Sequence, residues 1–262
     1  MASGDRPPPD LVGKRVVTIS TGHRVELPVR LRAQMRGATF AAPFGPVADL
    51  LPEGLEPIRA TARGHAAVTL LSVEYRDVDV PGLDPYDEFA VVVPAGHDSP
   101  AAVPYLSALT RATDGYVWYM PVTTEAARAF GVDVWGYPKV VADITHEDDG
   151  SVRETTVTVD DDRFATLEVA RPPSFDTEDT GSTYTVENGR LYEVPSRIDA
   201  DLGGWPFSTE VSVSFGDHPR AAPLRSLDLG PRALGRFVLD GEVYFHRAEP
   251  VPVDADPGRR PR

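Results

Sequence analysis

Hydrophobic residues in this chain fall into many short runs, and most of these runs alternate with polar residues at every second position. Such alternation is typical of β-strands that bury one face. The candidate strands span residues 16–31 (broken near 21–23), 36–44, 65–80, 89–94, 116–122, 140–144, 152–159, 164–169, 191–194 and 238–245. Many short strands with few helices predict a mainly β (α+β) protein, built as a curled antiparallel sheet or a closed β-barrel.

Three dipeptides with a strong turn preference separate several of these runs: Asp149-Gly150, Asn188-Gly189 and Asp240-Gly241. Asp-Gly and Asn-Gly favour two-residue hairpin loops because both positions tolerate positive φ. They predict an antiparallel meander in the C-terminal half of the chain. The polar segment 171–183 predicts a loop, one that contacts between subunits could order.

Two short helices are predicted between strands. The first spans Pro46–Leu51, where a proline suits the first turn and Pro52 ends the helix. The second begins at Thr123-Thr124-Glu125, has 126–130 as its body and stops at Gly131. The chain is therefore not purely β.

The length of 262 residues is typical of one large domain or two small ones. We expect a single domain at 15–252. The polar, proline-rich residues 1–14 predict a mobile N-terminal tail, and 253–262 predict a C-terminal tail. Within the domain, 101–112 is predicted to be helical in part.

Charge and composition exclude several classes of partner. The formal net charge of −14 disfavours binding to nucleic acid and to anionic membranes. The chain has no cysteine, which excludes disulfides, thiolate nucleophiles and cysteine-bound metals. No apolar run approaches the roughly 18–20 residues that span a bilayer, and the N-terminus does not resemble a signal peptide. We interpret the protein as cytoplasmic.

No motif for a metal or a phosphate stands out. The acidic stretches 146–149 and 160–162 fall in predicted hairpin loops, where exposed carboxylates are usually only solvated, and calcium-loop spacing is missing. The six histidines show no paired ligand spacing, and neither a P-loop nor a nucleophile-elbow pattern occurs. We therefore expect neither a metal nor a cofactor.

One lysine carries the main chemical signal. Of 26 basic residues only Lys14 and Lys139 are lysines, and only a lysine amine can become neutral and nucleophilic inside a protein. Lys139 lies in V-D-V-W-G-Y-P-K-V-V-A-D-I-T at 132–145, where Pro138 fixes the backbone before an apolar strand. A solvated lysine that discourages strand pairing is the simpler interpretation. The apolar residues on both sides favour a buried one instead.

Four segments resemble the acetoacetate decarboxylase family. They are W-G-Y-P-K at 135–139, P-Y-D-E at 85–88, L-L-P-E-G-L at 50–55 and F-G-D-H-P-R-A-A-P-L at 215–224. The resemblance covers about residues 25–250 and implies the curled-sheet or barrel architecture of that family. Family members often form larger oligomers, so it also implies a homo-oligomer.

The resemblance assigns roles to individual residues. It implies that Lys139 forms a Schiff base with a substrate carbonyl and that Glu88 lines the same pocket. Arg32, with Arg36 as the alternative, matches an arginine expected to bind a substrate carboxylate. We expect Trp135 and Tyr137 of the lysine motif to border the substrate.

One departure from the family pattern affects how the lysine is activated. The best-known decarboxylases carry two consecutive lysines, whereas Val140 follows Lys139 here. Burial alone can neutralise a lysine, so desolvation has to provide nearly the whole effect. Glu88 is predicted where a loop enters an apolar strand, and it is either a solvated turn carboxylate or a group that orients the lysine and relays protons.

These residues predict a cofactor-independent enzyme that acts on a small keto acid. The neutral amine of Lys139 would form an iminium, most simply to decarboxylate a β-keto acid such as acetoacetate. Two alternatives stay open. The same iminium can serve an aldolase or a dehydratase, and a barrel with a buried lysine can bind a small molecule without turnover.

Overall fold

The computed structural model describes residues 15–97 and 115–252. The tails predicted at 1–14 and 253–262, and the partly helical segment predicted at 101–112, lie outside the described residues. Within the described part of the chain, no helix is both long enough and apolar enough to cross a membrane.

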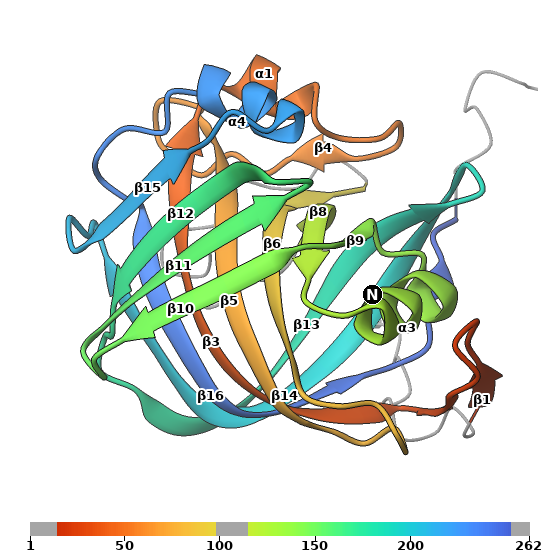
Figure 1. Ribbon diagram of the computed structural model, residues 1–262. Helices are drawn as coiled ribbons and strands as arrows, with labels where there is room; N and C mark the ends of the chain where they lie inside the picture. The colour runs from red at the N-terminus through yellow and green to blue at the C-terminus, as the bar shows by residue number, and fades with distance from the viewer. Residues whose placement is uncertain (1–14, 98–114, 253–262) are drawn as a thin grey trace, which may run out of the picture.

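Seven strands close into a barrel (Figure 1). In order around the barrel they are β13 (Phe175–Glu187), β14 (Arg190–Pro206), β16 (Gly235–Phe245), β3 (Val29–Ala42), β5 (Ala66–Val78), β6 (Tyr86–Val93) and β8 (Gly115–Val122). The pairs from β13 to β8 along this order are antiparallel, and the barrel closes where Thr183 and Tyr184 of β13 pair in parallel with β8. The mainly β barrel predicted from the sequence is confirmed.

A second sheet of four strands lies across the outside of the barrel (Figure 1). Its strands are β10 (Asp143–Asp148), β11 (Val152–Val159), β12 (Asp162–Ala170) and β15 (Val211–Phe215). The predicted hairpin at Asp149-Gly150 joins β10 to β11, and Gly150 has a φ of 87°. The acidic stretch at 146–149, predicted to be a loop, instead belongs mostly to β10.

The remaining elements are short. The strands are β1 (Arg15–Thr18), β2 (Arg24–Leu27), β4 (Glu56–Pro57), β7 (Ala95–Gly96), β9 (Lys139–Val141) and β17 (Glu249–Pro250). The helices are α1 (Phe44–Ala48), α3 (Glu125–Trp135), α4 (Ala222–Ser226) and the 3-10 helix η2 (Pro219–Ala221). Helix α1 starts before the predicted Pro46, which lies within its first turn.

Strand alternation separates two hydrophobic cores. On β3, Leu31 and Met35 point into the barrel and pack with apolar residues of β5, β6, β8 and helix α3. Phe40 points outward and packs against the second sheet with Leu167 and Phe164 of β12. Both faces of the barrel wall are buried along this stretch, and the inner face borders a cavity.

Two predictions of irregular structure are wrong. Residues 175–183, assigned to a loop, form the first part of β13, which pairs with β14 at every position from Phe175 to Glu187. Asp240-Gly241 is not a turn but lies within β16. A Cβ on Gly241 would come within 2.5 Å of the Cα of Ala200 on β14, so the glycine allows two strands to approach closely. The predicted turn at Asn188-Gly189 does join β13 to β14.

Candidate active site

The barrel encloses a cavity with about 760 Å³ of empty space, its mouth included. Most of its lining is aliphatic or aromatic, with side chains such as Leu31, Val73 and Phe130. Two ionisable groups of opposite charge, Glu88 and Lys139, are set into this apolar wall. Such a cavity suits a small, largely apolar ligand held by a few polar groups.

Helix α3 delivers the lysine motif to the cavity. The side chain of Thr124 caps its first turn by accepting a hydrogen bond from the Ala127 N–H at 3.1 Å. The helix ends at Gly136, whose φ of 72° is the left-handed conformation that glycine adopts most easily. The predicted stop at Gly131 is therefore wrong, since the helix runs on to Trp135. Trp135 anchors this end by donating its indole N–H to the His246 carbonyl at 2.8 Å.

The chain then turns back across the helix and brings Lys139 over Gly131. Tyr137 N–H donates to the Gly131 carbonyl at 3.2 Å, and Lys139 pairs in parallel with Met120 of β8. A Cβ on Gly131 would lie 2.3 Å from Cε and 2.4 Å from Cδ of Lys139. Gly131 thus makes room for the lysine side chain, a role that its position in the sequence did not reveal.

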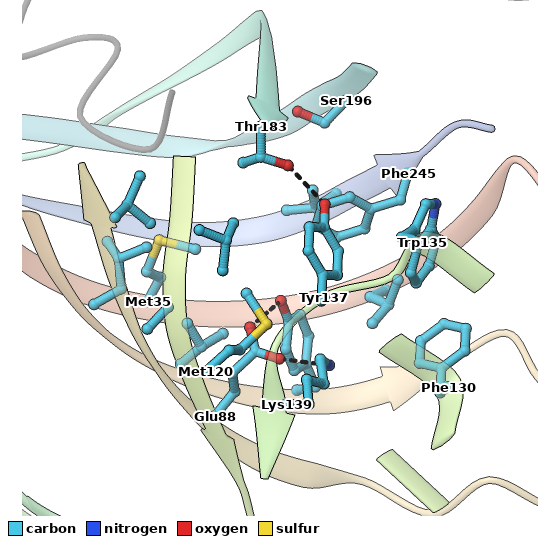
Figure 2. Close-up of a pocket in the computed structure, with 18 of the residues that line it drawn as sticks. Met35, Glu88, Met120, Phe130, Trp135, Tyr137, Lys139, Thr183, Ser196 and Phe245 are labelled. Carbon is cyan, nitrogen blue, oxygen red and sulfur yellow. Dashed lines mark hydrogen bonds and ion pairs between the residues drawn. The ribbon is translucent and has the colours of Figure 1, made fainter. Parts of the chain in front are cut away.

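Lys139 and Glu88 form a buried ion pair. Lys139 Nζ lies 2.7 Å from Glu88 Oε2, and the two side chains are only 4% and 5% exposed. The dashed line between them in Figure 2 marks this contact. The ring of Tyr86 lies 5.2 Å from Nζ. Glu88 comes from inside β6, whose first residue is Tyr86, and not from the loop that was predicted to precede the strand.

Tyrosines surround the pair and keep their protons. The Tyr75 hydroxyl donates to Glu88 Oε1 at 3.2 Å. Burial, and secondly the negative charge of Glu88, raises the pKa of Tyr75 and of Tyr86 well above the usual value. Burial also raises the pKa of Tyr137, although its hydrogen bond with Thr183, 2.6 Å between hydroxyl oxygens, opposes the shift. All three remain neutral over the physiological pH range.

Of the remaining predicted site residues, the aromatic pair reaches the cavity and the arginines do not. Trp135 and Tyr137 both line it. Arg32 is exposed on the outer face of β3, because the neighbouring Leu31 points into the barrel. Arg36 also points outward, where it is only 1% exposed and binds Asp148 under the second sheet. Among the described residues that line the cavity, Lys139 is the single cation.

Val140 lies on the other side of the strand from the cavity. It packs, half-buried, against the outer hydrophobic core, whereas Lys139 before it points into the barrel. Successive strand side chains face opposite ways, so a second lysine at this position would not enter the cavity. The environment of the Lys139 amine is therefore set by the apolar wall and by Glu88.

Tyr75 is a site residue that the sequence pattern does not reveal. Its strand was predicted, and the two-residue period places Tyr75 on the same face as Val73. That face could not be assigned to the cavity without the partner strand, because both faces of β5 are buried.

Comparisons with known proteins agree with this architecture. The family model described as "Acetoacetate decarboxylase (ADC)" matches residues 19–235. No curated protein sequence matches the chain significantly. A solved acetoacetate decarboxylase from Legionella pneumophila subsp. pneumophila str. Philadelphia 1 is 14% identical, with a TM-score of 0.62 over 86% of this chain and 87% of that chain.

Two other solved structures show a comparable likeness. The enduracididine biosynthesis enzyme MppR complexed with pyruvate is 15% identical, with a TM-score of 0.61 over 85% of this chain and 90% of that chain. An acetoacetate decarboxylase-like enzyme from Sphingomonas wittichii RW1 is 15% identical, with a TM-score of 0.57 over 86% and 92%. At these identities the likeness establishes the fold.

Proposed function

Because this chain belongs to the acetoacetate decarboxylase family, we propose that it is an enzyme whose Lys139 forms a Schiff base with a small keto acid, and that it decarboxylates a β-keto acid such as acetoacetate. The observation that carries this proposal is the contact of 2.7 Å between Lys139 Nζ and Glu88 Oε2 in an apolar cavity. Membership of the family supports an enzyme, and the apolar cavity with its ion pair supports the specific reaction.

The contact supplies a way to make the amine nucleophilic. Moving one proton from the Lys139 ammonium to the Glu88 carboxylate turns an ion pair into a neutral amine beside a neutral acid. Both arrangements have the same net charge, and an apolar surrounding disfavours the ionised one. The Tyr75 hydroxyl holds Glu88 from its other oxygen, so the carboxyl group stays in place as the proton moves.

The reaction then follows from the electron-accepting iminium. The neutral amine adds to the ketone carbonyl, and water leaves after Glu88 returns its proton to the oxygen. The electrons of the bond between the α-carbon and the carboxylate move toward the iminium nitrogen, which releases carbon dioxide and leaves an enamine. A proton, passed through Glu88, adds to the enamine carbon. Water then hydrolyses the new iminium to the product ketone and free Lys139.

The lining of the cavity favours loss of carbon dioxide. A carboxylate in apolar surroundings is destabilised relative to neutral products. Among the described lining residues no arginine offsets this charge, so the iminium formed on Lys139 is its main counterion. Decarboxylation removes both charges at once, whereas a reaction that retains the carboxylate leaves it without a fixed cation.

A specific feature supports aldol addition or dehydration as a second candidate. The hydroxyls of Tyr137, Thr183 and Ser196 line the cavity, and Figure 2 shows Thr183 and Ser196 away from Lys139. They could hold a second carbonyl compound. One structure of MppR contains the condensation product of pyruvate and imidazole 4-carboxaldehyde. The same enamine that takes up a proton in decarboxylation would attack an aldehyde here.

Borohydride trapping tests the proposal at a single atom. The chain has two lysines, so Lys14→Arg is a matched control for Lys139→Arg. Reduction in the presence of acetoacetate, followed by peptide mapping, should leave on Lys139 the reduced imine of the substrate or of its decarboxylated product, in the wild type and in Lys14→Arg. Carbon dioxide release should be lost in Lys139→Arg only.

The possible results separate the candidates. An adduct on Lys139 without carbon dioxide release would support aldol or dehydratase chemistry in place of decarboxylation. Binding of the keto acid with neither an adduct nor turnover would support a non-catalytic binding barrel. An adduct on Lys14 alone would contradict the role proposed for Lys139.

A further inference from the structure

Three potential metal ligands meet outside the barrel, behind the wall that carries Glu88. Glu74 on β5 and Asp87 on β6 are directly opposite each other in the antiparallel register and both point outward. His146 of β10 in the second sheet reaches the same point. One ligand atom from each of the three residues lies within 4.8 Å of the others.

His146 is held with one ring nitrogen directed at the carboxylates. Its side chain is 10% exposed, and its Nδ1 lies 2.9 Å from the Thr155 hydroxyl oxygen. Its Nε2 is buried without a hydrogen-bond partner and lies 3.6 Å from Asp87 Oδ1. When Nδ1–H donates to Thr155, the lone pair of Nε2 faces two carboxylates. Three electron-pair donors then point at one another.

This arrangement is unfavourable without a cation between the ligands. Like charges directly opposite on neighbouring strands destabilise a sheet, an effect that two arginines partly offset at Glu74. A buried ring nitrogen without a hydrogen-bond partner has an energetic cost of its own. The hydroxyl of Thr155, itself 2.6 Å from the Ser72 hydroxyl oxygen, holds the histidine ring in place, as hydrogen-bond partners usually do for metal-bound histidines.

The arginines nearby leave the ligand atoms accessible. Arg76 and Arg153 both contact Glu74, at 3.2 Å and 2.8 Å, and both use the same oxygen, Oε2. Oε1 of Glu74 is thus left for another partner. Arg153 also forms an ion pair with Asp148, and Asp148 forms a second one with Arg36. The two buried arginines, Arg36 and Arg153, thus face Asp148 and Glu74, whereas Arg76 is half exposed. The carboxylate of Asp87 is directed at His146.

We propose that Glu74, Asp87 and His146 form a binding site for a divalent transition-metal cation, with Zn²⁺ as its best candidate. One imidazole nitrogen and two carboxylate oxygens are ligands that Zn²⁺ accepts, with water as the fourth. An imidazole disfavours Mg²⁺ and Ca²⁺, which prefer oxygen ligands. Since the ligands come from β5, β6 and β10, the cation would join the second sheet to the barrel wall.

The site is distinct from the cavity, although the two share a strand. Asp87 and Glu88 are neighbours on β6 and point to opposite faces, so the cation would not touch Lys139 or its substrate. Its role would be structural, fixing the strand that carries Glu88. The ligands are spread over residues 74, 87 and 146, which explains why no spacing motif revealed them.

Metal binding to tag-free, chelator-treated protein tests the site. Calorimetric titration with ZnCl₂ should show one Zn²⁺ per chain, with weaker binding of MgCl₂. At a free Zn²⁺ concentration about a hundredfold above Kd, Tm should rise by roughly 5–10 °C. His146→Gln should lower the affinity at least tenfold and abolish the Tm shift, whereas His65→Gln, an exposed control, should leave both unchanged.

A second variant protects the test against misfolding. Asp87→Asn should also lower the affinity at least tenfold, and circular dichroism checks that both variants keep the wild-type fold. Two results would overturn the proposal. If wild-type protein binds no stoichiometric Zn²⁺, an ion pair between His146 and Asp87 is the whole interaction. If both variants bind Zn²⁺ as tightly as wild type, the cation lies elsewhere. Neither result affects borohydride trapping at Lys139.

Discussion

Two buried polar regions of this protein differ in how many partners each charged group has. Between the barrel and the second sheet, Arg36 and Arg153 are each 1% exposed and share Asp148. Arg36 also donates to the carbonyls of Gly150 and Val169. Inside the barrel, Lys139 and Glu88 pair with each other in an apolar cavity. The arginines and the cavity pair are all buried, although Asp148 is 24% exposed, and the surroundings of the two regions are very different.

The difference separates a structural network from a reactive pair. Charged side chains that make several hydrogen bonds to rigid strands are held in one conformation. A single lysine and a single carboxylate in a cavity can exchange a proton, and a ligand has room to reach them. The two regions should therefore respond in opposite ways to mutation, one in activity and the other in stability.

Replacing the cavity pair should have the largest effect, and it should fall on activity. In the double variant Lys139→Met, Glu88→Gln, we expect turnover of acetoacetate to fall at least about a thousandfold, as is usual when a nucleophile is removed. The free energy of unfolding should stay the same or rise by roughly 1–4 kcal/mol, because a buried ion pair is often no more stable than an uncharged one. Steady-state kinetics and denaturant unfolding measure the two effects. A large loss of stability would show that the pair is structural.

Breaking the network should have the reverse result. Arg36→Leu takes one of two arginines from Asp148, which keeps Arg153, so we expect the free energy of unfolding to drop by roughly 1–3 kcal/mol. Arg32→Leu, four residues earlier on the same strand but exposed, should change it by less than about 0.5 kcal/mol. Denaturant unfolding compares the two variants. Neither should change KM for acetoacetate much, and a large rise in KM for Arg32→Leu would restore Arg32 as a substrate-binding residue.

Adding one methyl group at Gly131 should damage the cavity without removing any charge. The new Cβ of Gly131→Ala would overlap Cδ and Cε of Lys139, so the amine has to move away from Glu88. Since a displacement of about 1 Å can cost a hundredfold in rate, we expect kcat to fall by roughly 10- to 100-fold. Gly45→Ala in α1 is the matched control, because its Cβ would meet no atom within 4 Å. Equal losses in both variants would count against a positioning role for Gly131.

Local patterns were enough to predict the β-barrel and the rigid setting of Lys139. Short alternating runs gave most of the strands, and the motif around Pro138 predicted a buried lysine. Arg32 was assigned to the pocket by resemblance alone, and β3 is buried on both faces over much of its length, so the hydrophobic pattern could not show which side Arg32 faces. A shift of one residue along a strand moves a side chain to the other face.

Other errors arose where pairing between distant strands overrides local preference. The polar segment 175–183 is a strand because β14 provides hydrogen-bond partners along its whole length. Asp240-Gly241 has turn chemistry but pairs with strands on both sides, where the glycine lets them approach. Glycine is typical of a helix end, but Gly131 lies within α3, where it makes room for the side chain of Lys139 eight residues later. Each of these contacts joins residues from different elements, so a local sequence pattern cannot predict it.

The smallest effect should come from the hydroxyl that holds Glu88. Tyr75→Phe removes a hydrogen bond to a charged group, for which we expect kcat to fall roughly tenfold. The pKa of Tyr75 is raised by burial and by Glu88, so its hydroxyl stays protonated well above pH 10. Deprotonation of Tyr75 therefore cannot be the cause of any loss of activity that occurs below pH 10. The pH–rate profiles of wild type and Tyr75→Phe should have the same alkaline limb.

Stability at high pH provides an independent measurement on the same variant. Above pH 10 an unfolded chain loses the Tyr75 proton that the folded chain keeps, so the stability linked to this group is complete below pH 10 and is lost as pH rises further. From pH 10 to 11, Tyr75→Phe should therefore lose less unfolding free energy than wild type. Tyr192→Phe, at a half-buried position outside the cavity, should follow the wild-type curve. Identical curves for all three proteins would mean that Tyr75 ionises as freely in the barrel as in water, and the cavity would then be too wet to neutralise Lys139.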